Sequence, residues 1–146
     1  MKSVLIVDDE AICRLLFTRV LQQADYSVDA VECGADALEA IEGRMYDAIL
    51  MDMQMPGIDG CTLAQRIRGR FDAASGTAPR LVLLSATHAD ARPQAHTPWP
   101  FDAQITKDAA VDGLCAFMTR LFEKDGATPA AMPANPSRID LGTATG

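Results

Sequence analysis

The stretch that decides the fold is DAILMDMQMPGIDG, residues 47–60. Four apolar residues, 48–51, run directly into Asp52, and turn-forming Pro, Gly and Asp residues follow at 56–60. A short apolar run bounded by turn signals predicts a strand that is buried on both faces, as in a parallel sheet. Asp52 then stands where this strand emerges at the carboxyl edge of the sheet, the edge at which open α/β folds bind ligands. Asp52 is therefore the first candidate functional residue.

Strand-like and helix-like segments alternate along the rest of the chain. Apolar, β-branched runs predict five strands, at 2–7, 26–31, 48–52, 80–85 and 103–106. Apolar residues at helical spacing predict helices after residue 10, from 34 to 43, after residue 60 and from 108 to about 124. This alternation predicts an α/β fold, a doubly wound, flavodoxin-like sheet of five parallel strands in the order 2-1-3-4-5, flanked by helices.

Three local features of the helices follow from the sequence. The first helix is predicted to carry one apolar stripe, made of Ile12, Leu15, Leu16, Val20 and Leu21. The last helix begins after Asp108, whose side chain we expect to cap it. Prolines at 93, 98 and 100 predict that the helix expected between the fourth and fifth strands is shortened or replaced by a Pro-rich loop.

Composition limits the function classes. The chain has 146 residues, 49% hydrophobic and 23% charged, and a net charge of −7 with no basic stripe, which argues against direct nucleic-acid binding. We expect one domain at 1–124 and a flexible Ala/Pro/Gly/Thr-rich tail at 125–146. Neither a signal peptide nor a membrane span is evident, and the four cysteines fit no zinc site or disulfide scaffold. We therefore expect a cytoplasmic protein without membrane contact.

Charged side chains gather at the predicted carboxyl edge of the sheet. Asp8 and Asp9 end the first strand and Asp52 ends the third, and these two strands are neighbours in the predicted order. At about 5 Å and an effective dielectric of about 20, each carboxylate pair repels by about 3 kcal/mol. Oxygen ligands of this kind favour Mg²⁺. Ser85 and Lys107, at the ends of the fourth and fifth strands, add a hydroxyl and an ammonium group, which suits phosphoryl transfer onto Asp52.

The arrangement resembles the receiver (CheY-like) domain of bacterial two-component response regulators. The resemblance covers residues 1–124 and rests on Asp8-Asp9, Asp52, Met55-Pro56-Gly57 with Asp59-Gly60, Ser85-Ala86 and Lys107. It implies a stand-alone signalling domain that accepts a phosphoryl group on Asp52 from a sensor histidine kinase or a phosphotransfer protein, and then signals to a downstream protein target. Such a domain is not an enzyme beyond its own phosphorylation and dephosphorylation.

The resemblance also implies a role for each site residue. Asp9, Asp52 and the backbone carbonyl of Gln54 would ligate Mg²⁺, with Asp8 acting through water. Ser85 would donate a hydrogen bond to a phosphoryl oxygen, and Lys107 would pair with the phosphoryl group.

Two positions depart from the family pattern. Asp108 follows Lys107 where proline is usual, so a cis bond there would be costly, and Asp108 could compete with Asp52 for the ammonium group. Gln104 stands where an aromatic residue is usual. These departures leave open an alternative, a receiver-like module that engages partners independently of phosphorylation. A phosphatase with an aspartyl-phosphate intermediate fits poorly, because Gln54 stands where a second carboxylate is expected.

Overall fold

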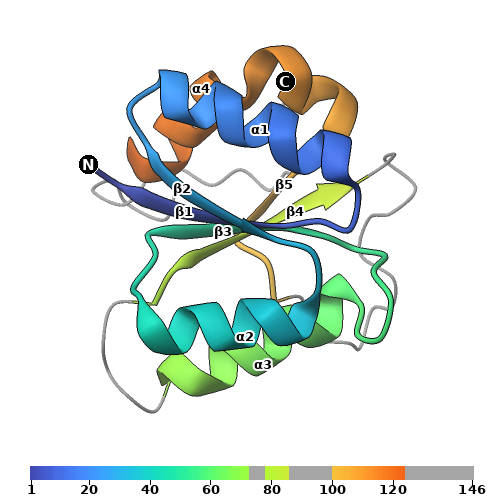
Figure 1. The fold of residues 1–146 in the computed structure, drawn as a ribbon. Helices are drawn as coiled ribbons and strands as arrows, with labels where there is room; N and C mark the ends of the chain where they lie inside the picture. Colours follow the sequence, from blue (N-terminus) through green and yellow to red (C-terminus); the bar gives the residue numbers. More distant parts are fainter. Residues whose placement is uncertain (73–77, 86–99, 124–146) are drawn as a thin grey trace. The chain divides into compact units, whose positions relative to one another are not determined.

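The structure, a computed structural model, describes residues 1–72, 78–85 and 100–123. Its centre is a five-stranded parallel sheet in the order β2-β1-β3-β4-β5 (Figure 1). The strands are β1 (Ser3–Val7), β2 (Ser27–Val31), β3 (Ala48–Asp52), β4 (Arg80–Ser85) and β5 (Ala103–Thr106). The predicted strand order, with the first and third strands adjacent, is confirmed.

The predicted central strand is the most deeply buried of the five. All five residues of β3 are buried, and its first four are fully excluded from solvent. On one side Val7 of β1 pairs with Met51, and on the other Leu84 of β4 pairs with Asp52. Because all the strands are parallel, their carboxyl ends meet at one edge of the sheet. Asp8, Asp52, Ser85 and Lys107 are brought to that edge by the topology.

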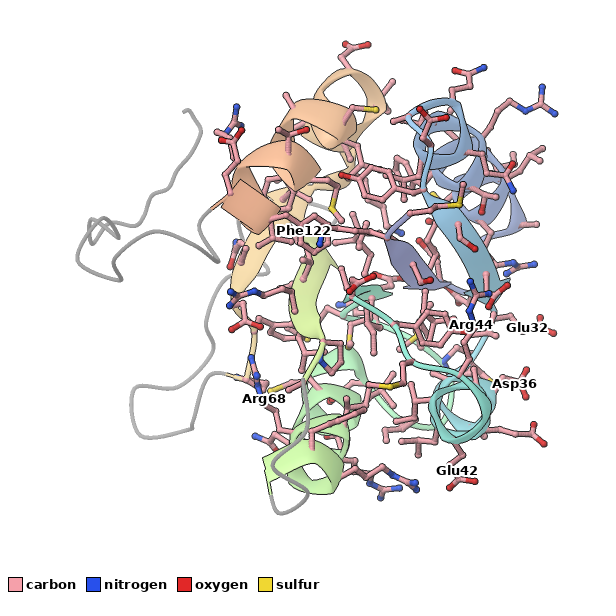
Figure 2. All side chains as sticks on the ribbon, turned by 90° about the vertical axis from the view of Figure 1, so that its left-hand side faces the viewer. Glu32, Asp36, Glu42, Arg44, Arg68 and Phe122 are labelled. Atoms are coloured by element: carbon pink, nitrogen blue, oxygen red, sulfur yellow. The ribbon has the colours of Figure 1, made fainter. Side chains whose placement is uncertain are left out.

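Four helices lie in the described residues: α1 (Ala11–Gln23), α2 (Gly34–Gly43), α3 (Gly60–Asp72) and α4 (Lys107–Glu123). Helices α2 and α3 cover one face of the sheet (Figure 1). Ala37 on α2 and Leu63 and Ile67 on α3 are fully buried in the core cluster with the strand residues of that face. Asp36 and Glu42 point outward from α2 (Figure 2), as expected for an amphipathic helix.

Helix α1 corrects the sequence analysis. Of its apolar residues, Phe17 and Leu21 are the buried ones, whereas Ile12 is 79% exposed and Leu15 62%. Phe17 and Leu21 are four residues apart and therefore share one face. The stripe that runs through Ile12, Leu15 and Leu16 lies on a different side of the helix. The prediction of one apolar stripe that includes Leu21 is therefore wrong, and α1 displays a second apolar surface.

The chain divides into two compact units, Met1–Cys115 and Ala116–Gly146. The first contains the sheet, α1 to α3, the beginning of α4 and every candidate site residue. Of the second, only the last two turns of α4 are described. The Pro-rich loop predicted after β4 and the tail at 125–146 lie outside the described residues, so both stay predictions. In the part that is described, no helix combines the length and the apolar character that a membrane crossing requires.

Candidate functional site

Three carboxylates converge at the carboxyl edge of the sheet. Asp8 and Asp9 follow β1, and Asp52 ends β3. One carboxylate oxygen from each of the three lies within 4.8 Å of those from the other two. Asp8 is fully buried, and Asp52 is 8% exposed. The predicted convergence of these three side chains is therefore present in the structure.

A single lysine connects this cluster. The Nζ of Lys107 lies 3.0 Å from Oδ2 of Asp8, 2.8 Å from Oε1 of Glu10 and 3.5 Å from Oδ2 of Asp52. Burial alone would lower the pKa of Lys107, but its hydrogen bonds to Glu10 and Asp8 and the charge of Asp52 outweigh burial and raise that pKa. The ammonium group thus stays protonated at neutral pH and partly neutralises the site.

The environment of Asp52 makes its carboxylate unusually basic. Burial raises its pKa from 3.8 to about 6, and the charge of Asp8 adds to the effect. The ammonium group of Lys107 and a hydrogen bond from the main chain of Gln54 act in the opposite direction. At neutral pH Asp52 is still mostly ionised. Its oxygens form a more nucleophilic carboxylate than those of an exposed aspartate, since nucleophilicity rises with basicity.

Ser85 lies at the same edge but makes no side-chain hydrogen bond to the acidic cluster in the described residues. It ends β4, one residue beyond the partner of Asp52, and pairs with Thr106 of β5. Its Oγ is fully buried and has no hydrogen-bond partner among the residues that the structure describes. An unsatisfied buried hydroxyl costs free energy, so a ligand oxygen that accepts its hydrogen bond would be stabilising.

The start of α4 settles two points about Asp108, the geometry of its bond to Lys107 and its competition for the ammonium group. No cis peptide bond occurs in the described chain, so the Lys107–Asp108 bond is trans. The contacts of the Lys107 ammonium group are with Asp8, Glu10 and Asp52, and Asp108 is exposed. The expected Asp108 cap is wrong. The Oγ1 of Thr106 accepts a hydrogen bond from the N–H of Ala109 at 3.2 Å, and Asp108 lies inside the first turn.

The loop between β3 and α3 holds Asp52 through its main chain. Gly57 has a φ of +88°, a conformation that favours glycine. Asp59 caps α3, because its Oδ1 accepts the N–H of Thr62 at 2.7 Å. The N–H of Gly60 donates to the carbonyl of Met53 at 2.7 Å, and a Cβ at Gly60 would collide with the main-chain oxygen of Asp52. The glycine therefore allows α3 to approach the end of β3 closely.

Three further residues surround the cluster that the sequence analysis did not assign to the site. The N–H of Glu10 donates to Oδ1 of Asp8 at 2.9 Å, and Cys13 donates a hydrogen bond to Oε1 of Glu10 at 3.3 Å. The guanidinium group of Arg14 donates to the main-chain oxygen of Asp8 at 2.8 Å. Glu10 directly follows Asp8 and Asp9 and is the residue before α1. Its place in the same acidic run was the sequence feature that could have indicated a role in the site.

The donor set fits a hard divalent cation. Asp8, Asp9 and Asp52 offer only oxygen atoms, and Mg²⁺ prefers a few carboxylates together with water. Four carboxylates, including Glu10, lie close together here, and only three of them contact the Lys107 ammonium group, so a cation among them would relieve repulsion. A second group, Asp8, Glu10 and Cys13, also has ligand atoms within 4.8 Å of one another. The thiol of Cys13 is a soft ligand that Mg²⁺ does not prefer, which disfavours this metal there.

Comparison with known proteins identifies the family. Residues 4–119 match the family model described as response regulator receiver domain. The chain is 40% identical over 88 residues to hybrid signal transduction histidine kinase L of Dictyostelium discoideum, which covers 58% of this chain and 5% of that kinase. The curated relatives that match first are longer proteins, of which the chain spans between 5% and 28%.

Solved structures agree with this assignment. The response regulator TrrA of Thermotoga maritima, solved in complex with Mg²⁺–BeF, has a TM-score of 0.70 and 31% identity, over 83% of this chain and 99% of TrrA. The complex of the histidine kinase ThkA with TrrA matches with a TM-score of 0.65 and 30% identity, over 83% and 98% of the two chains. With the strand order and the family match, these similarities show that the chain belongs to the response regulator receiver domain family.

Proposed function

We propose that this receiver domain accepts a phosphoryl group on Asp52 in a site that contains Mg²⁺. The observation that carries the proposal is the convergence of the Asp8, Asp9 and Asp52 carboxylates within 4.8 Å, beside the ammonium group of Lys107. Asp9, Asp52 and the main-chain carbonyl of Gln54 would bind the metal, and Asp8 would act through water. The relative TrrA was solved with Mg²⁺–BeF, which supports the same metal here.

The transfer step needs an ionised Asp52. One of its oxygens forms a bond to phosphorus while the bond between phosphorus and the donor nitrogen of a phosphohistidine breaks. The electron pair of the broken bond remains on the imidazole nitrogen. With a pKa of about 6, the acceptor is mostly ionised at neutral pH and becomes protonated as the pH falls below that value. Bound Mg²⁺ would lower this pKa and keep the acceptor ionised.

Two side chains of this site would stabilise the transferred group. Lys107 carries a positive charge 3.5 Å from the acceptor oxygen, and the buried hydroxyl of Ser85 has a hydrogen bond to donate. Bound Mg²⁺ would supply further positive charge next to the phosphoryl oxygens. Positioned charges of this kind account for most of the catalysis of phosphoryl transfer.

The donor in this proposal is a sensor histidine kinase or a phosphotransfer protein. TrrA has been solved in complex with the histidine kinase ThkA. Beside the acceptor site of the present chain, α1 exposes Ile12 and Leu15, two large apolar side chains that follow Glu10 within five residues. Exposed apolar side chains that cluster near a functional group indicate a protein-binding surface. We assign the donor to this surface.

The remaining parts of the proposal concern output and location. The phosphorylated domain would signal by binding a downstream protein target rather than nucleic acid, since the chain carries a net charge of −7. We place it in the cytoplasm. The four cysteines, all within the described residues, form no disulfide, as expected in a reducing compartment.

Incubation with acetyl phosphate and Mg²⁺ tests the acceptor. We expect the wild type to gain the mass of one phosphoryl group. No mass should be added when Mg²⁺ is chelated before the reaction, or in Asp52→Asn. An added phosphoryl group that persists in Asp52→Asn would refute the assignment of the acceptor. The double variant Ile12→Ser and Leu15→Ser tests the donor surface. It should react normally with acetyl phosphate and slowly with the cognate kinase.

One observation favours the second candidate, a module that binds partners without phosphorylation. The ammonium group of Lys107 lies closer to Glu10 and Asp8 than to Asp52. The same incubation decides between the two, because the wild type would then gain no phosphoryl group at any concentration of acetyl phosphate.

A further inference from the structure

The ammonium group of Lys107 is shared unequally among its three carboxylate partners. Its contact with Oε1 of Glu10 at 2.8 Å is a charge-assisted hydrogen bond, and its contact with Oδ2 of Asp8 at 3.0 Å is a close ion pair. The distance to Oδ2 of Asp52 is 3.5 Å, at the outer limit of such contacts. The residue assigned to the phosphoryl group is thus bound mainly by other carboxylates before any phosphoryl group arrives.

Glu10 is placed to hold that lysine. Its own N–H donates to Oδ1 of Asp8 at 2.9 Å, and the thiol of Cys13 donates to the same Oε1 that binds Lys107. The side chain of Glu10 is nevertheless 60% exposed, so water can solvate its carboxylate once the lysine leaves. The ion pair between Glu10 and Lys107 therefore has a defined geometry but can be broken at a small cost in free energy, as a reversible restraint requires.

We propose that Glu10 is a positioning residue that holds the Lys107 ammonium group away from Asp52 until the phosphoryl group attracts it. The inference rests on the proposed function. As charge develops on the phosphoryl oxygens, Lys107 has to exchange Glu10 for the incoming group. Glu10 then slows phosphoryl uptake and gives the lysine a place to return to after the phosphoryl group is lost.

Phosphorylation by acetyl phosphate at saturating Mg²⁺ measures this restraint. Because an exposed ion pair is weak, Glu10→Gln should raise the rate about two- to fivefold. Glu39→Gln is the matched control, because it removes the same charge from an exposed position on α2 and should leave the rate unchanged. Glu10→Asp, which keeps the charge on a shorter side chain, should give an intermediate rate.

A double-mutant cycle separates the restraint from a simple loss of negative charge. In the Lys107→Gln background Glu10→Gln should have no effect, since the residue through which it acts is gone. An equal increase in both backgrounds would show a general electrostatic effect and would overturn the proposal. An unchanged or reduced rate in Glu10→Gln alone would overturn it as well.

A crystal structure of Glu10→Gln without phosphoryl donor provides a test that does not depend on phosphorylation. We expect the Nζ of Lys107 to move to within hydrogen-bond distance of Asp52, compared with 3.5 Å in the wild type. A lysine that stays in place would contradict the role of Glu10. If the wild type accepts no phosphoryl group, the proposed function fails, whereas this structure still decides whether Glu10 holds the lysine.

Discussion

The carboxylates at the amino edge and at the carboxyl edge of the sheet have opposite electrostatic surroundings. At the amino edge two carboxylates are matched with their own donors. Asp47, which precedes β3, accepts the N–H of Ser3 at 2.8 Å. Asp102, which precedes β5, accepts the N–H of Leu81 and pairs with Arg68 of α3, both at 2.8 Å; Arg68 is labelled in Figure 2.

At the carboxyl edge the carboxylates outnumber the positively charged side chains that contact them. Asp8, Glu10 and Asp52 share one ammonium group, Asp9 lies beside them without an ion pair to it, and burial raises the pKa of Asp52. A site that binds a cation and a phosphoryl group brings carboxylates close together, and their repulsion is unfavourable when no cation is bound. This contrast indicates that one edge is arranged for stability and the other for binding. Equivalent substitutions at the two edges should therefore have effects of opposite sign.

Removal of the shared cation should have the largest effect. Lys107→Gln leaves Asp8, which is fully buried, without its ion pair, and uncompensated buried charge is strongly destabilising. We expect the free energy of unfolding at pH 7.5, without Mg²⁺, to fall by about 2–4 kcal/mol. Urea denaturation measures it. A loss below that of an ordinary surface substitution would mean that the carboxylates do not depend on Lys107.

Neutralising the acceptor should stabilise the protein. A pKa raised to about 6 means that ionised Asp52 opposes folding, so Asp52→Asn should raise the free energy of unfolding without Mg²⁺. The expected gain at pH 7.5 is about 1–3 kcal/mol. A destabilised variant would show that the carboxyl edge is not under electrostatic strain.

The pH dependence of this effect has a definite sign. The folded state holds the Asp52 proton more tightly than the unfolded state, whose pKa is near 3.8. The contribution of Asp52 to stability is therefore fully present below that value and is lost as the pH rises to about 6. The stability difference between Asp52→Asn and the wild type should widen over this range and stay constant above it.

The matched substitution at the amino edge should have a smaller effect in the opposite direction. Asp102→Asn retains an oxygen for the N–H of Leu81 but loses the charge that pairs with Arg68. Because both side chains of this pair are about a quarter to a third exposed, we expect a loss of about 1 kcal/mol. Thermal unfolding in parallel with Asp52→Asn checks the sign, and a gain in stability would remove the contrast between the edges.

Much of this arrangement could be predicted from the sequence because it depends on chain direction. Apolar runs that end in Asp8, Asp52 and Lys107 bring those residues to one edge as soon as the strands are parallel. The burial of α1 could not be predicted in the same way. Two apolar faces, one through Ile12 and Leu15 and another through Phe17, satisfy the helical period, and only packing against the sheet decides between them.

Two details of the site, the cap of α4 and the partner of Lys107, could not be predicted from the spacing of apolar residues. Thr106 and Asp108 are both good capping residues, and the helix begins early enough that Thr106 takes this role. Glu10 was visible as part of an acidic run, but its contact with Lys107 joins residues 97 positions apart. Such contacts follow from side-chain placement at the sheet edge, which the sequence pattern does not define.

The most direct test of the contrast between the edges is the effect of Mg²⁺ on the free energy of unfolding of the wild type and Asp52→Asn. We predict that Asp52→Asn is the more stable protein in chelator and that saturating Mg²⁺ stabilises the wild type more, so that the advantage of the variant disappears. Equal stabilisation of both proteins by Mg²⁺, or of neither, would contradict a carboxyl edge organised around Asp52 and a cation.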